Sequence, residues 1–98
     1  MSNNAEKRHL TAVANLPCVL CRALGERTEG VQVHHIREGQ GMGQRSPHWL
    51  AIPLCPACHT GPLGIHGNRS LMRIAKVEEL DLLAMTIEQL SRKWQGAA

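Results

Sequence analysis

The four cysteines of the chain form two pairs, Cys18 with Cys21 and Cys55 with Cys58, and each pair encloses two residues. Zn²⁺ prefers four tetrahedral ligands, and a two-residue spacer lets one tight turn supply two thiolates to the same ion. A thiol–disulfide oxidoreductase would instead place one pair in a βαβ fold, whereas this chain has two pairs and no βαβ pattern. We therefore predict a structural zinc ion bound by all four cysteines, with unrelated buried cysteines as the alternative.

Histidines form the second group of side chains that could bind a metal ion, because five of the six lie between residues 34 and 66. His34 and His35 adjoin each other at the end of an expected strand. Adjacent side chains on a strand point to opposite faces, so one can bind a metal while the other faces a reacting phosphorus. His34, His59 and His66 together could hold one face of a divalent cation and leave the other positions to water and phosphate oxygens. Ordinary surface or core histidines are the alternative.

The charge pattern favours a phosphate-rich partner. The formal net charge of +3 is weak support by itself, and four zinc-bound thiolates would reduce it. The distribution is more informative, since the segment 34–76 contains five basic residues and one acid, Glu38. The five basic residues are Arg37, Arg45, Arg69, Arg73 and Lys76. A positive segment of this kind suits nucleic acid, although such clusters are also common on solvated surfaces.

The elements that must position these residues follow from the hydrophobic pattern. Asn3 or Asn4 is expected to cap a helix that runs to about Asn15. The inward-facing residues of this helix would be Leu10, Val13 and Ala14. Segments 31–36 and 50–54 predict two strands, separated by a long glycine-rich loop over residues 37–48. Asn68 is then expected to cap a further helix.

A C-terminal helical segment over about residues 68–94 is expected to cover the core, with a break near Val77. Its buried stripe would comprise Leu80, Leu83, Ile87, Leu90 and Trp94, for which a dimer seam is the alternative role. With 98 residues and no Phe or Tyr, the chain has a small core that needs a metal staple. No apolar run is long enough to cross a bilayer and the first residues are polar, so we expect a cytoplasmic protein with reduced cysteines.

Two stretches of the sequence resemble the HNH, or ββα-metal, endonucleases that carry a zinc-binding cysteine quartet. They are Val-His-His-Ile-Arg at 33–37 and Ile-Pro-Leu-Cys-Pro-Ala-Cys-His at 52–59, and the resemblance covers about residues 16–70. With the later Gly-Ile-His-Gly at 64–67, the sequence is most similar to phage and prophage proteins of the recombination-enhancement, RecA-dependent nuclease type. The fold we expect is α+β: a small zinc-stapled ββα-metal core with an N-terminal helix and C-terminal helices, in one domain over residues 1–98.

By this resemblance the chain is a metal-dependent endonuclease that hydrolyses phosphodiester bonds in DNA with weak sequence preference. His35 would be the general base. The ligands of a catalytic Mg²⁺, Mn²⁺ or Zn²⁺ ion would be His34, His59 and His66. Three residues that flank these positions are expected to contact phosphates, namely Arg37, Arg45 and Arg69. A recombinase is a further candidate partner.

The sequence departs from the family pattern in two places. The Asn expected just before the second strand is absent, and only His48 or Ser46 could orient His35 in its place. The last metal ligand is also displaced, because many relatives place it where this chain has Leu63. His66 can reach the metal only if the preceding turn bulges. The alternative functions are a non-catalytic zinc-knuckle module that binds nucleic acid, which would have no need for His35, and a purely structural zinc protein of a phage assembly.

Overall fold

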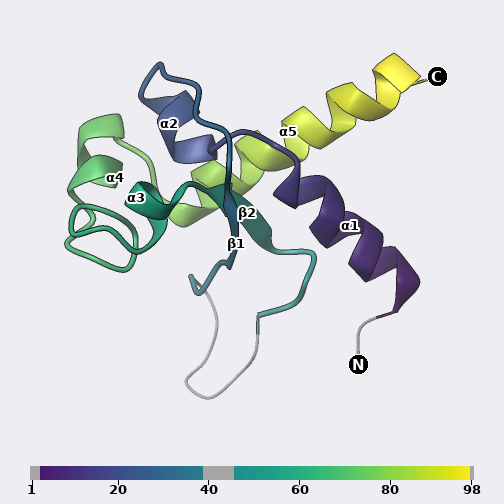
Figure 1. The fold of residues 1–98 in the computed structure, drawn as a ribbon, viewed down its shortest axis with the longest axis horizontal. Coiled ribbons are helices and arrows are strands. Elements are labelled where there is room, and N and C mark those ends of the chain that lie inside the picture. The colour runs from purple at the N-terminus through teal and green to yellow at the C-terminus, as the bar shows by residue number, and fades with distance from the viewer. Residues whose placement is uncertain (1–2, 39–45, 98) are drawn as a thin grey trace.

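The structure, a computed structural model, describes residues 3–38 and 46–97. Two antiparallel strands lie at its centre with helices around them (Figure 1). In chain order the elements are α1 (Asn4–Ala14), α2 (Val19–Ala23), β1 (Gln32–His35), β2 (Ala51–Leu54), α3 (Pro56–His59), α4 (Ser70–Ala75) and α5 (Glu79–Ala97). The predicted α+β class is confirmed. Within the described ranges, no helix is long and apolar enough to cross a membrane.

The two strands lie where the sequence predicts them, and each is slightly shorter than expected. Their register places His34 opposite Ile52. One further bond continues the ladder, because the amide of Ile36 donates to the carbonyl oxygen of Leu50 at 2.9 Å. The strand pair therefore holds both His34 and His35 in regular extended backbone at the end of β1.

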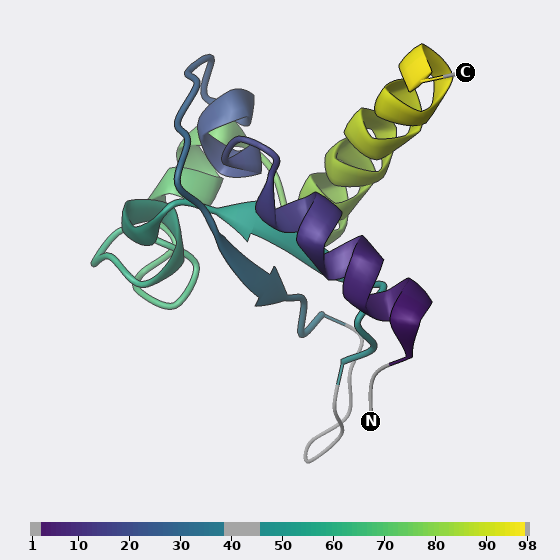
Figure 2. The ribbon, with the colours of Figure 1, turned by 45° about the vertical axis from the view of Figure 1, so that its right-hand side comes forward.

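All four residues of β2 are buried, because α1, α2 and α5 pack against this strand. Figure 2 shows α1 beside the strand pair and the C-terminal half of α5 extending away from the rest of the molecule. Fully buried aliphatic side chains fill the core, among them Leu20, Ile36, Ile52, Leu54 and Leu82. Three of the cysteines belong to the same buried cluster, so the expected zinc site is part of the core.

The helix α1 begins at the predicted cap. Asn3 Oδ1 accepts a hydrogen bond from the amide of Glu6 at 2.8 Å, and Glu6 Oε1 accepts one from the amide of Asn3 at 3.0 Å. Val13 is fully buried and Leu10 half-buried, as expected. Ala14 is exposed, contrary to the prediction. Successive residues of a helix point in different directions, and the face that contains Val13 is the one that meets the core.

The buried face of α5 differs from the predicted stripe. Leu83 is buried as predicted and Leu90 is half-buried, but Leu80 and Ile87 are 52% and 50% exposed. The residues that face the core are Leu82, Leu83, Thr86 and Gln89, which follow the spacing of one helix face. Thr86 can lie there because its hydroxyl donates to the carbonyl oxygen of Leu82 at 2.9 Å. Hydropathy alone would assign this buried position to an apolar residue. Thr86 can occupy it because its hydroxyl is already hydrogen-bonded within the helix. The side chain of Trp94 lies outside the described part of the chain.

The helix α4 begins one residue later than predicted. Its N-cap is Arg69, in the left-handed conformation at φ 63°, rather than Asn68. The Asn68 side chain still contributes, because its Oδ1 accepts from the amide of Ser70 at 2.9 Å. Lys76 ends the helix, also in the left-handed region at φ 59°. This is the break predicted near Val77, and it turns the chain into α5.

Candidate metal centres

Each cysteine pair opens a short helix. Cys18 and Cys55 are the N-caps of α2 and α3, and Cys21 and Cys58 are the third residues of these helices. The sequence predicted turns here, and the first turn of a helix brings two side chains three residues apart to one side in the same way. The amide of Cys21 points at Cys18 Sγ at 3.4 Å. Helix N-termini also favour the thiolate form of cysteine.

The sulfur–sulfur distances match a tetrahedral zinc site. Sγ of Cys21 lies 3.8 Å from that of Cys55 and 3.7 Å from that of Cys58. A tetrahedron with Zn–S bonds of about 2.3 Å has edges of about 3.8 Å. All four cysteines are free thiols, and Thr28 donates its hydroxyl to Cys21 Sγ at 3.2 Å. The cluster therefore fits one Zn²⁺ ion.

Ionising all four sulfurs requires a cation. Burial raises the pKa of Cys58 far above its usual range, and the neighbouring Cys18 raises it further. Burial likewise raises the pKa of Cys21. At Cys55 burial acts in the same direction, but hydrogen bonds from the Cys58 amide and from the other thiols outweigh it and lower the pKa. A bound Zn²⁺ ion would stabilise the thiolates outright.

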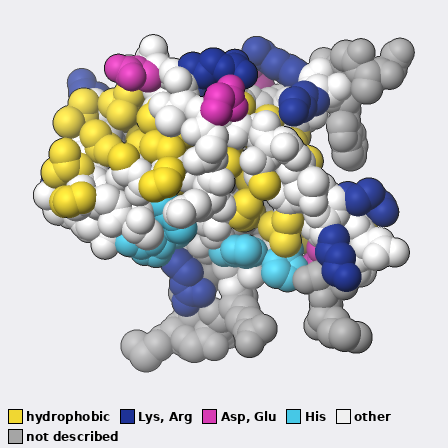
Figure 3. Space-filling model, in the orientation of Figure 1, with side chains coloured by type: hydrophobic (Ala, Val, Ile, Leu, Met, Phe, Trp, Pro, Cys, Tyr) yellow, Lys and Arg dark blue, Asp and Glu magenta, His cyan; other side chains and the backbone are white. Residues whose placement is uncertain are grey.

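Three of the predicted histidines meet at a second centre. The ligand nitrogens of His34, His59 and His66 all lie within 4.8 Å of one another, and Nδ1 of His34 is 3.3 Å from Nε2 of His59. Two nitrogens that bind one tetrahedral metal at about 2.1 Å lie about 3.4 Å apart. Three protein ligands leave a position for water or substrate. Figure 3 shows histidine side chains in a row across one face, with most visible acidic side chains at the opposite edge.

These three histidines come from three different segments. His34 lies on β1, His59 is the last residue of α3, and His66 lies in the turn after α3. The turn folds back on α3, and the amide of His66 donates to the carbonyl oxygen of His59 at 3.0 Å. Gly64 is buried in this turn, where a Cβ atom would lie 2.5 Å from the carbonyl oxygen of Cys58. Glycine at this position therefore lets the backbone pack closely enough to bring His66 beside His59.

Glu79, the first residue of α5, contacts this centre and was not predicted. The residue is 2% exposed, and its Oε1 accepts a hydrogen bond from Nε2 of His34 at 3.0 Å. Its Oε2 accepts from the amides of Glu38 at 2.8 Å and Arg37 at 3.2 Å. A carboxylate on the outer ring nitrogen fixes the tautomer of a metal-binding histidine, which here directs Nδ1 of His34 towards His59. No sequence signal marks Glu79, because it is 45 residues from His34 and belongs to an acidic run typical of a solvated helix face.

The electrostatics of the centre favour an ionised Glu79 and neutral forms of His34 and His59. Burial alone would raise the pKa of Glu79, but the hydrogen bonds from His34 and from the two amides outweigh it and lower the pKa. Arg69 adds a positive charge, with Nη2 3.9 Å from Oε1. Burial, together with the nearby His66 and Arg69, lowers the pKa of His34 although Glu79 raises it, and burial also lowers the pKa of His59. Neutral imidazole is the form that binds a metal ion.

His35 and His48 form a separate pair beside the cluster. Nε2 of His35 is 2.9 Å from Nδ1 of His48. The pKa of His35 is lowered chiefly by burial and secondarily by His48 and His34. The buried hydroxyl of Ser46, the other candidate partner, has no hydrogen bond among the described residues. The sequence left His48 and Ser46 as candidates to orient His35. In the structure it is His48 that lies beside His35.

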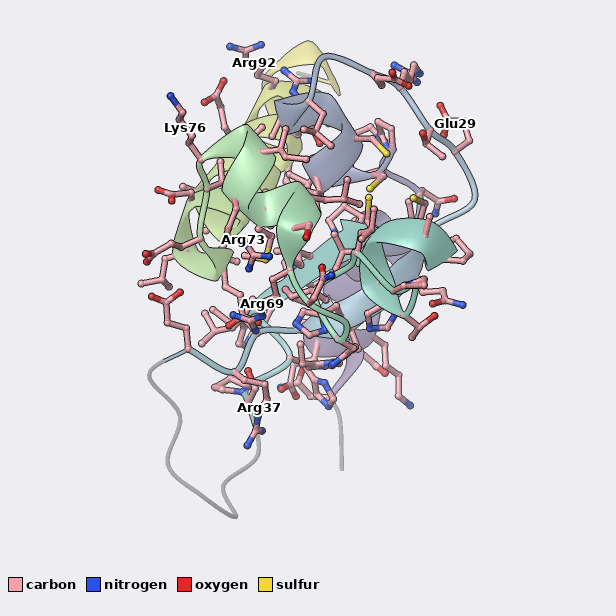
Figure 4. The ribbon with its side chains drawn as sticks, turned by 90° about the vertical axis from the view of Figure 1, so that its left-hand side faces the viewer. Glu29, Arg37, Arg69, Arg73, Lys76 and Arg92 are labelled. Carbon is pink, nitrogen blue, oxygen red and sulfur yellow. The ribbon has the colours of Figure 1, made fainter. Side chains whose placement is uncertain are left out.

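The three arginines predicted to contact phosphates are only partly described. Arg37 and Arg69 line an open hollow of about 720 Å³, in which Glu79 also forms part of the wall. Arg45 lies outside the described residues. Figure 4 shows Arg37, Arg69, Arg73 and Lys76 following one another along one side of the molecule. Arg69 is held in place by a hydrogen bond from its Nε to the carbonyl oxygen of Ile65 at 3.0 Å.

Comparison with known protein families places the chain in a nuclease family. A family model described as "recombination enhancement, RecA-dependent nuclease" matches residues 2–78, which include both cysteine pairs and all six histidines. The chain belongs to this family. The two clusters described above are therefore found in a member of the RecA-dependent nuclease family, and the match ends just before Glu79. No similar protein was found among the curated proteins.

Proposed function

We propose that this protein is a metal-dependent endonuclease of the HNH type that hydrolyses phosphodiester bonds in DNA. The observation that carries the proposal is the cluster of His34, His59 and His66 next to the paired His35 and His48. The order β1, β2, α3 agrees with the strand–strand–helix arrangement of the ββα-metal type. Membership of a nuclease family supports the same class of reaction.

His34, His59 and His66 would hold the catalytic ion, for which Mg²⁺, Mn²⁺ and Zn²⁺ are the candidates. When bound, such an ion stabilises the charge that develops on the phosphate oxygens and on the leaving 3′ oxygen. Glu79 keeps the ring of His34 in its orientation through the bond to Nε2. The structural Zn²⁺ on the four cysteines would fix α3 and with it His59. In this proposal the first centre serves the fold and the second serves the reaction.

His35 would act as the general base. If its Nε2 donates to Nδ1 of His48, its own Nδ1 is unprotonated and can take a proton from the attacking water. His48 then fixes the tautomer and orientation of His35. This is the role we assign to His48 in place of the Asn that the HNH pattern contains.

DNA is the substrate that we assign to this site. Arg37 and Arg69 adjoin the histidine centre and would contact phosphates, and Arg45 receives the same role from its sequence position alone. Contacts to the backbone carry no direct sequence information, so cleavage should show weak sequence preference. A recombinase partner, in line with the family description, belongs to the same proposal. A phage or prophage origin and a location in the bacterial cytoplasm are also part of the proposal.

Nicking of supercoiled plasmid in the presence of Mg²⁺, Mn²⁺ or Zn²⁺ tests the proposal. The wild-type protein should nick, and His35→Ala should lose about 10²- to 10⁴-fold in rate because the base is gone, while DNA binding remains. The matched control is His9→Ala, which removes a histidine of α1 that contacts Trp49 rather than either metal centre. DNA binding without nicking by the wild type under any of these metals would favour the zinc-knuckle binding module instead. Equal nicking rates for the wild type and His35→Ala would show that His35 is not the general base.

A further inference from the structure

The hollow beside the histidine centre continues along α4, and we refer to it as the α4 groove. Its lining residues are Arg37, Glu38, Arg69, Met72, Arg73, Lys76, Val77, Glu78 and Glu79. Glu79 contacts His34 and also lines the groove, so the groove lies next to the histidine centre with Glu79 between the two. A strand that occupies the groove can therefore extend past Glu79 and Arg69 to the histidine centre.

The basic residues of the groove form a row rather than a single cluster. Arg69 and Arg73 are one helical turn apart, and Lys76 follows at the end of α4 (Figure 4). The guanidinium group of Arg73 is oriented by hydrogen bonds to the carbonyl oxygen of Asn68 at 2.7 Å and to Ser70 Oγ at 3.0 Å. A row of cations with set positions matches the repeating phosphates of a nucleic acid strand, whereas a small anion needs only one converging set.

The acids of the groove do not cancel this row. Glu79 is buried, its carboxylate accepts hydrogen bonds from His34 and from two amides, and its charge is set against that of Arg69, whose Nη2 lies 3.9 Å from Oε1. Glu38 accepts a hydrogen bond from the amide of Leu80 at 3.3 Å, at the start of α5. Glu78 is the remaining acid among the lining residues, so with Arg69 set against Glu79, three further cations face the groove against the two carboxylates of Glu38 and Glu78.

We propose that the α4 groove binds the DNA strand on one side of the scissile phosphate, with Arg73 and Lys76 contacting phosphates that are not cleaved. The inference rests on the proposed nuclease function and extends its substrate from a single phosphate to a strand of several nucleotides. Its direction is set by the geometry: the strand runs from the histidine centre past Arg69 and along α4 towards Lys76. Such contacts increase affinity for long substrates and leave the chemistry at one phosphodiester unchanged.

The test compares two double variants that each lose one arginine and one lysine. Arg73→Gln with Lys76→Gln alters the groove, and Arg92→Gln with Lys93→Gln alters exposed positions farther along α5. DNA affinity is measured by fluorescence anisotropy from 50 to 300 mM salt, with one single-stranded and one duplex oligonucleotide. Hydrolysis of bis(p-nitrophenyl) phosphate reports on the metal centre without a strand. Lys76→Gln alone serves as a second groove variant in case the double variant loses its fold.

The groove variant should lower the slope of log affinity against log salt by about 1.4 for single-stranded DNA or about 1.8 for duplex, because two phosphate contacts are lost. Lys76→Gln alone should lower it by half as much. The α5 variant should keep the wild-type slope, and all proteins should hydrolyse the small ester equally. An unchanged slope in the groove variants, or an equal loss in the α5 variant, overturns the inference. A protein that cleaves neither substrate but shows the predicted slopes refutes the nuclease proposal and leaves the groove assignment standing.

Discussion

At the scale of single residues, the ring of His34 is constrained at both of its nitrogens. Nε2 lies against the Glu79 carboxylate at 3.0 Å and Nδ1 lies 3.3 Å from Nε2 of His59. The same carboxylate also accepts from the amides of Arg37 and Glu38, which lie just beyond Ile36 after the end of β1. One buried side chain of α5 thus ties the end of β1 to the histidine centre. Loss of its charge should weaken metal binding without a large change in the core.

Glu79→Gln should therefore weaken binding at the histidine centre by about 10- to 100-fold, because the outer partner of His34 loses its charge. Competition titration with a chromophoric chelator measures the affinity of this centre, and thermal unfolding of the zinc-loaded protein reports on the fold. Glu78→Gln is the matched control, since this neighbour is exposed and makes no contact with His34 among the described residues. Equal affinities in the two variants would contradict the role given to Glu79.

At the scale of elements, local signals identified what starts and ends each segment better than which face is buried. The Asn3 cap, both strands and the break near Val77 follow from residues within a few positions of each boundary. The buried face of α5 depends instead on where β2 and α2 pack against it, and no nearby residue encodes that contact. The cysteine pairs were located by spacing, although they open helices rather than turns.

Two leucines of α5 test which face of the helix is buried. Leu82→Ala should lower the free energy of unfolding by about 2–5 kcal/mol, because a fully buried side chain leaves a cavity. Leu80→Ala, at a position that is 52% exposed, should change it by at most about 0.5 kcal/mol. Urea denaturation of the zinc-loaded protein, followed by circular dichroism, gives both values. If Leu80→Ala lowered the free energy of unfolding more than Leu82→Ala, the buried face would be the stripe that the sequence pattern predicts.

At the scale of the whole molecule, two metal-capable clusters share α3, which contributes Cys58 to one and His59 to the other. Three cysteines belong to the buried core, while the histidines reach from buried His34 to exposed His66. Residue type and spacing were sufficient to predict both sets of candidate ligands. Glu79 and the α4 groove were not predicted, because they arise where α5 and α4 fold back beside β1, far away in the sequence.

Removal of the structural zinc should unfold the chain. Cys18→Ser leaves three thiolates, and binding energies of about 10–16 kcal/mol for structural zinc are comparable to the whole stability of a domain of this size. Far-UV circular dichroism and zinc content of the variant check this. His66→Ala, which removes an exposed histidine of the second centre, should remain folded. A folded, zinc-free Cys18→Ser protein would contradict the structural role of the cluster.

The central claim is that the chain holds two metal ions at two separate centres, one of which is open to substrate. Metal content per chain after equilibrium dialysis against Zn²⁺ or Mn²⁺ tests it most directly, with His66→Ala measured in parallel. We predict two ions in the wild-type protein and one in the folded variant. One ion in both proteins under both metals would contradict the claim, since the cysteines alone would then bind metal.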